Sequence, residues 1–255
     1  RPSRKITDRS RRRRVHDADA LTNHELPMPL PLKFLDWVAL AWFFVWWLGY
    51  VRYADVHARK MPSLRSRMNT LRQTWMSELA SREVRIGDIN ILTNLSNGST
   101  FFASTTLLIL GGLLALLGTT DKVASVVMEL PFTKQGPERF WDIKILLLTS
   151  IFMFAFFKFT WSLRLFHFCS VMVGGAPPFD TDPAKRAEFA RHAANTAGLA
   201  AESFNNGLRA YYFALAALMW FLNAWVWMIA TSWVVLILYL REFRSQALMV
   251  LNETQ

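Results

Sequence analysis

The fold of this protein is decided by residues 210–240, which read AYYFALAALMWFLNAWVWMIATSWVVLILYL and contain no Asp, Glu, Lys or Arg. Residues 98–120 are likewise uncharged. The whole chain of 255 residues is 53% hydrophobic, its mean hydropathy is +0.19, and it contains 11 Trp and 20 Phe. Uncharged apolar runs of this length are typical of membrane-spanning segments. The composition therefore excludes an ordinary water-soluble domain and predicts an integral membrane protein.

Three further apolar segments bring the expected number of membrane spans to four. Span one is expected over residues 34–53, span two is centred on 107–117, span three on 143–163 and span four on 211–240. Each is continuously apolar, whereas the strands of a membrane barrel alternate apolar and polar residues over about ten positions. We therefore predict an all-α integral membrane protein with four transmembrane helices.

Three of these helices are expected to be longer than a bilayer core of about 30 Å requires. Asp88 suits the N-cap of a helix continuing to Gly118, and Asp142 suits the start of another that reaches Val173. The segment 209–240 is similarly long. Such helices must tilt strongly or extend beyond the bilayer at one end.

Two polar segments between the spans predict helices that form a collar on the protruding ends. In residues 63–81, apolar side chains recur at spacings of four and three, which indicates one apolar helix face. In residues 183–203, Asp182 suits an N-cap, Pro183 suits the first helical position, and an alanine stripe follows. As an alternative, the first of these helices carries enough arginine to lie in the headgroup plane.

The distribution of Lys and Arg near the spans predicts the orientation. Ten of them lie in the two collar connections, at positions 52 to 72 and 185 to 209, and six lie on the opposite side. By the positive-inside rule the collar is expected in the cytoplasm, and four spans would leave both termini outside. The expected location is a bacterial inner membrane, with the mitochondrial inner membrane as the alternative.

The N-terminal segment differs in character from the rest of the chain. Residues 1–14 contain eight Lys or Arg and one Asp, so they carry +7 of the net charge of +10. A basic segment of this kind suits a solvated tail, contact with anionic lipid, a nucleic-acid arm or a targeting segment. Of these partners, nucleic acid is not expected. Met28 is an alternative start, with which this segment would not have to cross the membrane. We divide the chain into an extension over 1–32, a four-helix membrane domain with its collar over 33–242, and a C-terminal tail over 243–255.

Polar residues within the apolar spans are the candidates for a functional site, because each must find a partner in lipid. Lys158 is the clearest, and it shares a helix face with Ser162. Its side chain either reaches an ion or substrate site or snorkels toward the interface marked by Arg164. The other candidates for a polar site within the membrane are Asn94, Asn97, Asn223 and Arg209.

A second set of positions predicts helix packing. Ser104, Gly111 and Gly118 repeat every seven residues, so that another backbone is expected to approach closely there. The partner would be an internal helix or a second copy of the chain.

Motifs for catalysis or metal binding are not evident in the sequence. Cys169 is the single cysteine, which excludes an intramolecular disulfide and metal sites that need paired thiolates. Only His167 lies near a span, so a bis-histidine haem is not expected. No cofactor or metal is expected.

The segments 103–114, 158–164 and 205–209 (ASTTLLILGGLL, KFTWSLR and NNGLR) together resemble the domain-of-unknown-function family numbered 599. The likeness covers approximately residues 29–242. The resemblance implies membrane location and four helices, as in bacterial inner-membrane proteins with relatives in plants, and it implies no ligand or activity. The basic N-terminal segment departs from the short N-terminus of that family, and Asn is common where His167 stands.

These features favour a structural or complex-forming four-helix membrane protein that self-associates or joins a larger complex. Its other expected contacts are the lipid bilayer and, at the basic segments, anionic lipid. One alternative is a small transporter or channel with a polar path near Lys158. A second is a lipid-modifying enzyme with a polar cluster at the collar interface. Of the three hypotheses, this enzymatic one is the least favoured.

Overall fold

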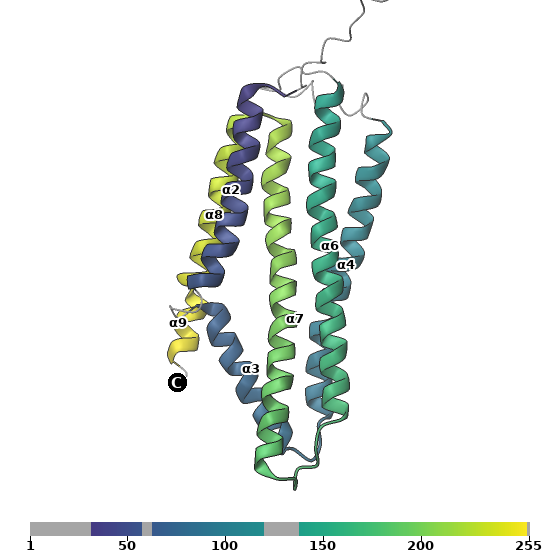
Figure 1. Cartoon of the computed structure of the whole chain (residues 1–255), viewed down its shortest axis with the longest axis vertical. Helices are drawn as coiled ribbons and strands as arrows, with labels where there is room; N and C mark the ends of the chain where they lie inside the picture. The colour runs from purple at the N-terminus through teal and green to yellow at the C-terminus, as the bar shows by residue number, and fades with distance from the viewer. Residues whose placement is uncertain (1–31, 58–62, 120–137, 254–255) are drawn as a thin grey trace, which may run out of the picture.

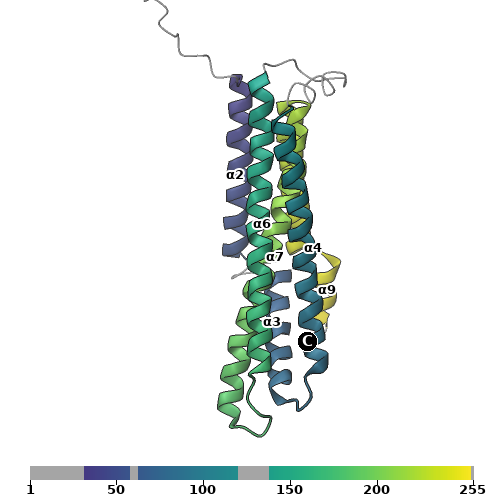
Figure 2. The ribbon, with the colours of Figure 1, turned by 90° about the vertical axis from the view of Figure 1, so that its right-hand side faces the viewer.

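The computed structural model describes residues 32–57, 63–119 and 138–253, and within these ranges all regular structure is helical. The helices form an elongated bundle (Figures 1 and 2). We call the end at which α2 begins the upper end, and the end at which α6 turns into α7 the lower end. The elements are α2 (Phe34–His57), α3 (Leu64–Ser81), α4 (Ile86–Leu117), α6 (Glu138–Gly174), α7 (Pro183–Leu218), the 3-10 helix η1 (Met219–Phe221), α8 (Ala224–Phe243) and α9 (Gln246–Glu253). The predicted N-terminal extension lies outside these ranges apart from Leu32.

Four helical segments in the described ranges are long and apolar enough to cross a membrane. They are Phe34–Ala54, Ile86–Leu117, Phe140–Gly174 and Ala224–Leu251. This confirms the predicted class, an all-α multi-pass membrane protein with four such helices.

The fourth span does not lie where the sequence placed it. The uncharged run 210–240 is not one helix: α7 ends at Leu218, η1 follows, and α8 starts at Ala224 and runs back down the bundle (Figure 1). Asn223 makes the break, because its backbone is extended and its Oδ1 accepts a hydrogen bond from the N–H of Trp225 at 3.2 Å. It is therefore an N-cap at the upper end and not a polar residue within a span.

Helix α7 rises beside α6 along its whole length and lies between α6 and the pair formed by α2 and α8 (Figure 1). The collar helix expected over 183–203 thus continues without a break to Leu218. In the upper half of α7, Ala210, Phe213, Ala214 and Ala217 are at most 1% exposed. Neighbouring helices cover this face of α7, so small alanine side chains fit there and the large apolar side chains of a lipid-facing span are not needed.

Two hydrophobic cores follow one another along the bundle. The upper core joins α2, α4, α6, α7 and α8, and the lower core joins α3 to the lower parts of α4, α6 and α7. Helices α2 and α8 end near mid-height, whereas α4, α6 and α7 continue downward beside α3 (Figures 1 and 2). The helices therefore extend past the level of the shorter spans at one end only.

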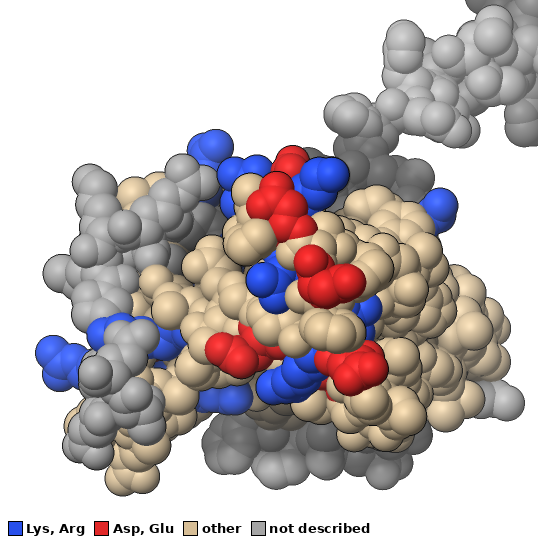
Figure 3. Space-filling model, turned by 90° about the horizontal axis from the view of Figure 1, so that it is seen from below, with Lys and Arg blue, Asp and Glu red and all other residues tan. Residues whose placement is uncertain are grey.

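Both polar segments are helical and lie together at the lower end of the bundle. Helix α3 packs against the lower half of α7, and Asp182 and Pro183 occupy the expected N-cap and first helical positions. Asp88, expected as an N-cap, instead lies in the first turn of α4, where it accepts hydrogen bonds from Trp75 Nε1 and Arg82, each at 2.7 Å. Viewed from below, the lower end shows Lys, Arg, Asp and Glu side chains interspersed (Figure 3), as expected for a surface in water.

Candidate functional site

The polar residues predicted as one intramembrane site do not meet in the structure. Asn94 and Asn97 are exposed on α4, and Arg164 is exposed on α6 over the ring of Phe168. Lys158 is half-buried, and its Nζ lies 5.4 Å from the ring centroid of Phe154 on its own helix. These positions do not line a common path with Asn223, which caps α8.

Ser162 joins three helices. Its side chain is fully buried, its Oγ donates to the carbonyl of Ala200 at 2.8 Å, and the hydroxyl of Ser99 lies 3.0 Å away. The bond crosses from α6 to α7, and the contact with Ser99 brings in α4. With both groups satisfied inside the protein, the geometry gives Ser162 a role in packing.

The sequence analysis missed a buried cation at the upper end. Lys144 is only 3% exposed, and its Nζ lies 4.0 Å and 4.5 Å from the ring centroids of Phe140 and Trp141. Asp36, also buried, attracts this ammonium group and accepts a hydrogen bond from Trp220 Nε1 at 3.0 Å. The sequence did offer a signal for this pair, because Asp36 and Lys144 have opposite charges and each lies near the start of a predicted span. The arrangement holds the upper ends of α2 and α6 and the 3-10 helix η1 together.

A polar pocket of about 260 Å³ lies at mid-height, where α2 and α8 end and α3 begins. We call it the arginine pocket, because four arginines from three helices line it. Arg209 is the one predicted candidate that it contains. Its other charged lining residues are two glutamates, and the full lining is Tyr50, Leu64, Arg65, Met68, Asn69, Arg72, Gly198, Ala201, Glu202, Asn205, Leu208, Arg209, Tyr212, Leu238, Arg241 and Glu242.

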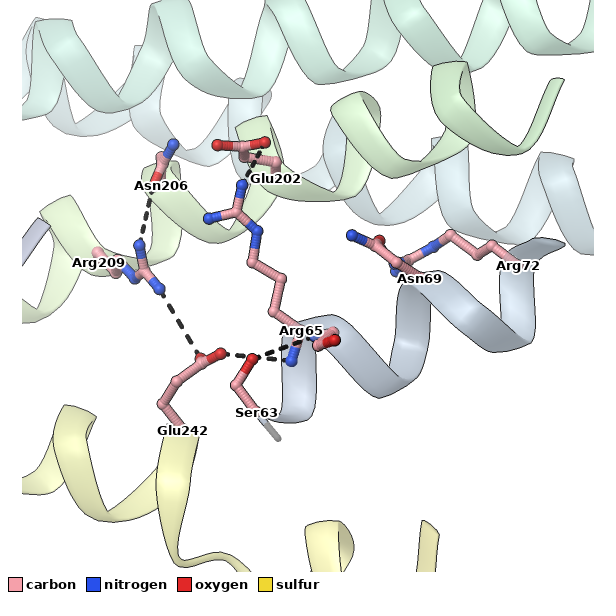
Figure 4. Close-up of polar contacts among 9 residues, drawn as sticks. Ser63, Arg65, Asn69, Arg72, Glu202, Asn206, Arg209 and Glu242 are labelled. Atoms are coloured by element: carbon pink, nitrogen blue, oxygen red, sulfur yellow. Dashed lines mark hydrogen bonds and ion pairs between the residues drawn. The ribbon is translucent and has the colours of Figure 1, made fainter. Parts of the chain in front are cut away.

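Ion pairs hold two of the four arginines (Figure 4). Arg65 of α3 lies 2.5 Å from Glu202 of α7, and its backbone N–H donates to Glu242 of α8 at 3.3 Å. Arg209 is 7% exposed, donates to Asn206 Oδ1 at 3.2 Å, and lies 3.8 Å from Glu242. These contacts connect α3, α7 and α8 at the level where the upper bundle meets the collar.

The other two arginines have neutral partners among the described residues. Arg72 donates to Asn69 Oδ1 at 2.8 Å, and Arg241 donates to the hydroxyl of Tyr212. Burial lowers the pKa of the Arg72 guanidinium from its ordinary value, because desolvation disfavours the charged form. The pocket therefore has two more positive than negative side chains, and among the described residues no ion pair with a carboxylate is formed by Arg72 or Arg241.

A second distinctive surface is the outer face of α4. Its residues follow one another at spacings of four, three and then seven, and all of them are exposed. They are Asn90, Asn94, Asn97, Ser104, Gly111 and Gly118. A Cβ atom built at Gly111 would meet nothing within 4 Å. The packing positions predicted from the sequence therefore point away from the helices of this chain, and α4 packs on α6 through its opposite face.

No group of three or more His, Cys, Asp or Glu side chains that could hold a metal ion occurs within residues 32–57, 63–119 and 138–253. Cys169 is buried in the lower core, and its Sγ lies 3.8 Å from the carbonyl oxygen of Ala193. The charged groups gathered at mid-height are the guanidinium and carboxylate groups of the arginine pocket.

Comparison with known proteins identifies a family. No curated protein and no solved structure matches the chain. The model of the family described as "Protein of unknown function, DUF599" matches residues 38–247, which is most of the chain. This protein is therefore a member of the DUF599 family.

Proposed function

We propose that this protein is a structural, complex-forming membrane protein that self-associates through the outer face of α4. The observation that carries the proposal is the exposure of Ser104, Gly111 and Gly118 at intervals of seven residues. A seven-residue repeat keeps the same positions turned toward a partner helix that crosses at a small left-handed angle. Small side chains there let the two backbones approach closely in lipid.

A second copy of the chain is the partner that the repeat favours. In a two-fold symmetric dimer the same face is used by both subunits, so each α4 would supply its own repeat. Helix α4 lies at the edge of the bundle beside α6 (Figure 1), which leaves room for a neighbour along it. The transporter alternative has less support, because the polar residues predicted within the spans do not line a common path.

Disulfide crosslinking in native membranes tests this interface. In a Cys169→Ser background, Ser104→Cys is expected to give a crosslinked dimer on mild oxidation. Leu114→Cys is the control, since Leu114 is also exposed but lies about 80° around the helix from Ser104. Equal crosslinking of both variants, or a monomer mass in mild detergent without any Ser104 crosslink, would contradict the proposal.

We further propose a bacterial inner-membrane location with a cytoplasmic collar and five membrane crossings, α7 being the fifth. Because α7 rises and α8 descends, the start of α2 and the end of α8 would then lie on opposite sides, in place of the same-side arrangement expected from four crossings. This moves Arg241 and Arg244 to the collar side, so the tally of Lys and Arg changes from ten against six to twelve against four. The stronger bias agrees better with the positive-inside rule.

Labelling of intact cells with an impermeant maleimide distinguishes these arrangements. In the Cys169→Ser background, Thr119→Cys is expected to react, whereas Gln73→Cys and Gln246→Cys are expected to react only after permeabilisation. Reaction of Gln246→Cys in intact cells would support four crossings. Reaction of Gln73→Cys would place the collar outside.

A further inference from the structure

We propose that the arginine pocket binds a phosphate group, supplied by the headgroup of an anionic lipid or by a soluble phosphate compound. The pocket presents four guanidinium groups and two carboxylates to one cavity. A planar guanidinium matches a phosphate with two parallel N–H donors, and arginine is the preferred residue for this recognition.

The ion pairs within the pocket do not neutralise all of the positive charge that a phosphate group needs. Glu202 and Glu242 lie close to Arg65 and Arg209, whereas Arg72 and Arg241 contact only the neutral groups of Asn69 and Tyr212 among the described residues. An entering phosphate would therefore meet two cations without displacing a carboxylate from either. The paired arginines are held in place by their glutamates, so part of the site is organised before binding (Figure 4).

The position and size of the cavity favour a headgroup. It lies where α2 and α8 end, which is the level at which the apolar upper bundle gives way to the collar. Basic pockets between membrane helices on the cytoplasmic side are typical sites for anionic lipid headgroups. A volume of about 260 Å³ is slightly below the roughly 300–1,000 Å³ of small-molecule sites. It suits a phosphate-bearing headgroup better than a complete lipid.

The wall of the pocket is amphipathic in the way such a ligand requires. Beside the charged groups, its lining includes four large apolar side chains, which are Leu64, Met68, Leu208 and Leu238. The hydroxyl of Tyr212 and the amide of Asn205 add neutral hydrogen-bonding groups from α7. A glycerol-linked phosphate would contact both kinds of surface.

Binding to the full chain in a neutral detergent tests the proposal with three probes. They are dioctanoyl phosphatidylglycerol, dioctanoyl phosphatidylcholine as the control of zero net charge, and inorganic phosphate, with the melting temperature and native mass spectra as readouts. Phosphatidylglycerol is expected to raise the melting temperature and to remain bound, and phosphatidylcholine is not. Protection by inorganic phosphate alone would keep the phosphate site and assign it to a soluble ligand.

Variants separate a specific site from a loss of folding. Arg72→Gln and Arg241→Gln are each expected to weaken binding about tenfold, the effect of losing one charge-assisted hydrogen bond. Arg164→Gln removes an exposed arginine of α6, which lies outside the pocket, and this variant should bind as the unmodified protein does. Glu202→Gln removes the negative charge that pairs with Arg65 and is expected to strengthen binding, which misfolding would not do.

Two results would overturn the proposal. One is that neither phosphatidylglycerol nor inorganic phosphate stabilises the protein. The other is equal binding by the Arg72→Gln, Arg241→Gln and Arg164→Gln variants. Neither result depends on whether the protein self-associates through α4.

Discussion

Replacing Gly207 by Ala tests the closest approach between α6 and α7. A Cβ atom at Gly207 would lie 2.6 Å from Cε1 of Phe159, well inside the optimal carbon separation of about 3.5–4.0 Å. The ring of Phe159 is fully buried and packs against the rings of Phe102, Phe204 and Tyr211. It therefore cannot move aside without disturbing its neighbours.

The magnitude follows from a comparison with a glycine in open space. Gly98 also lies within a helix, and a Cβ atom there would meet nothing within 4 Å. Both Gly→Ala changes gain about 0.8–1.0 kcal/mol of helix propensity, so this gain cancels when the two variants are compared. Overpacking at Gly207 costs about 1–3 kcal/mol. Gly207→Ala is therefore expected to be less stable than Gly98→Ala by about that amount.

The assay is reversible unfolding of the two variants in the same detergent, followed by circular dichroism. A double-mutant cycle with Phe159→Leu identifies the cause, because a smaller side chain at position 159 makes room for the new methyl group. The loss at Gly207 is then expected to shrink by about 1 kcal/mol or more. Equal stability of Gly207→Ala and Gly98→Ala would refute the close helix contact.

Three further predictions concern buried or capping groups. Ser162→Ala leaves the carbonyl of Ala200 without its hydroxyl donor, so we expect a loss of about 1–3 kcal/mol in unfolding experiments; no loss would show that the bond is unimportant. Asn223→Ala removes the N-cap of α8 and its bond to the N–H of Trp225. This should destabilise the protein by about 0.5–2 kcal/mol, whereas Asn223→Asp should keep most of the stability. Cys169 is 0% exposed, so maleimide should label it only after denaturation, and rapid labelling of the folded protein would contradict its burial.

The class of the fold could be predicted from the sequence alone. Hydropathy depends on composition, so the uncharged runs identified a helical membrane protein without any knowledge of contacts. Helix ends with strong local chemistry were also predictable, as the Asp182 cap followed by Pro183 shows. The seven-residue spacing of Ser104 and Gly111 identified a face of α4 but not its neighbour, because periodicity orients a helix only about its own axis.

Tertiary structure decided the path of the chain and which polar groups meet. The run 210–240 contains two antiparallel segments because Asn223 caps a new helix. The sequence did not reveal this turn, because it is uncharged and has nearly the same composition as a membrane span. The arginine pocket joins Arg65, Arg209 and Arg241, which lie far apart in the sequence, because α7 and α8 form this hairpin beside α3. Local patterns specify helices, but the contacts between their faces determine a site.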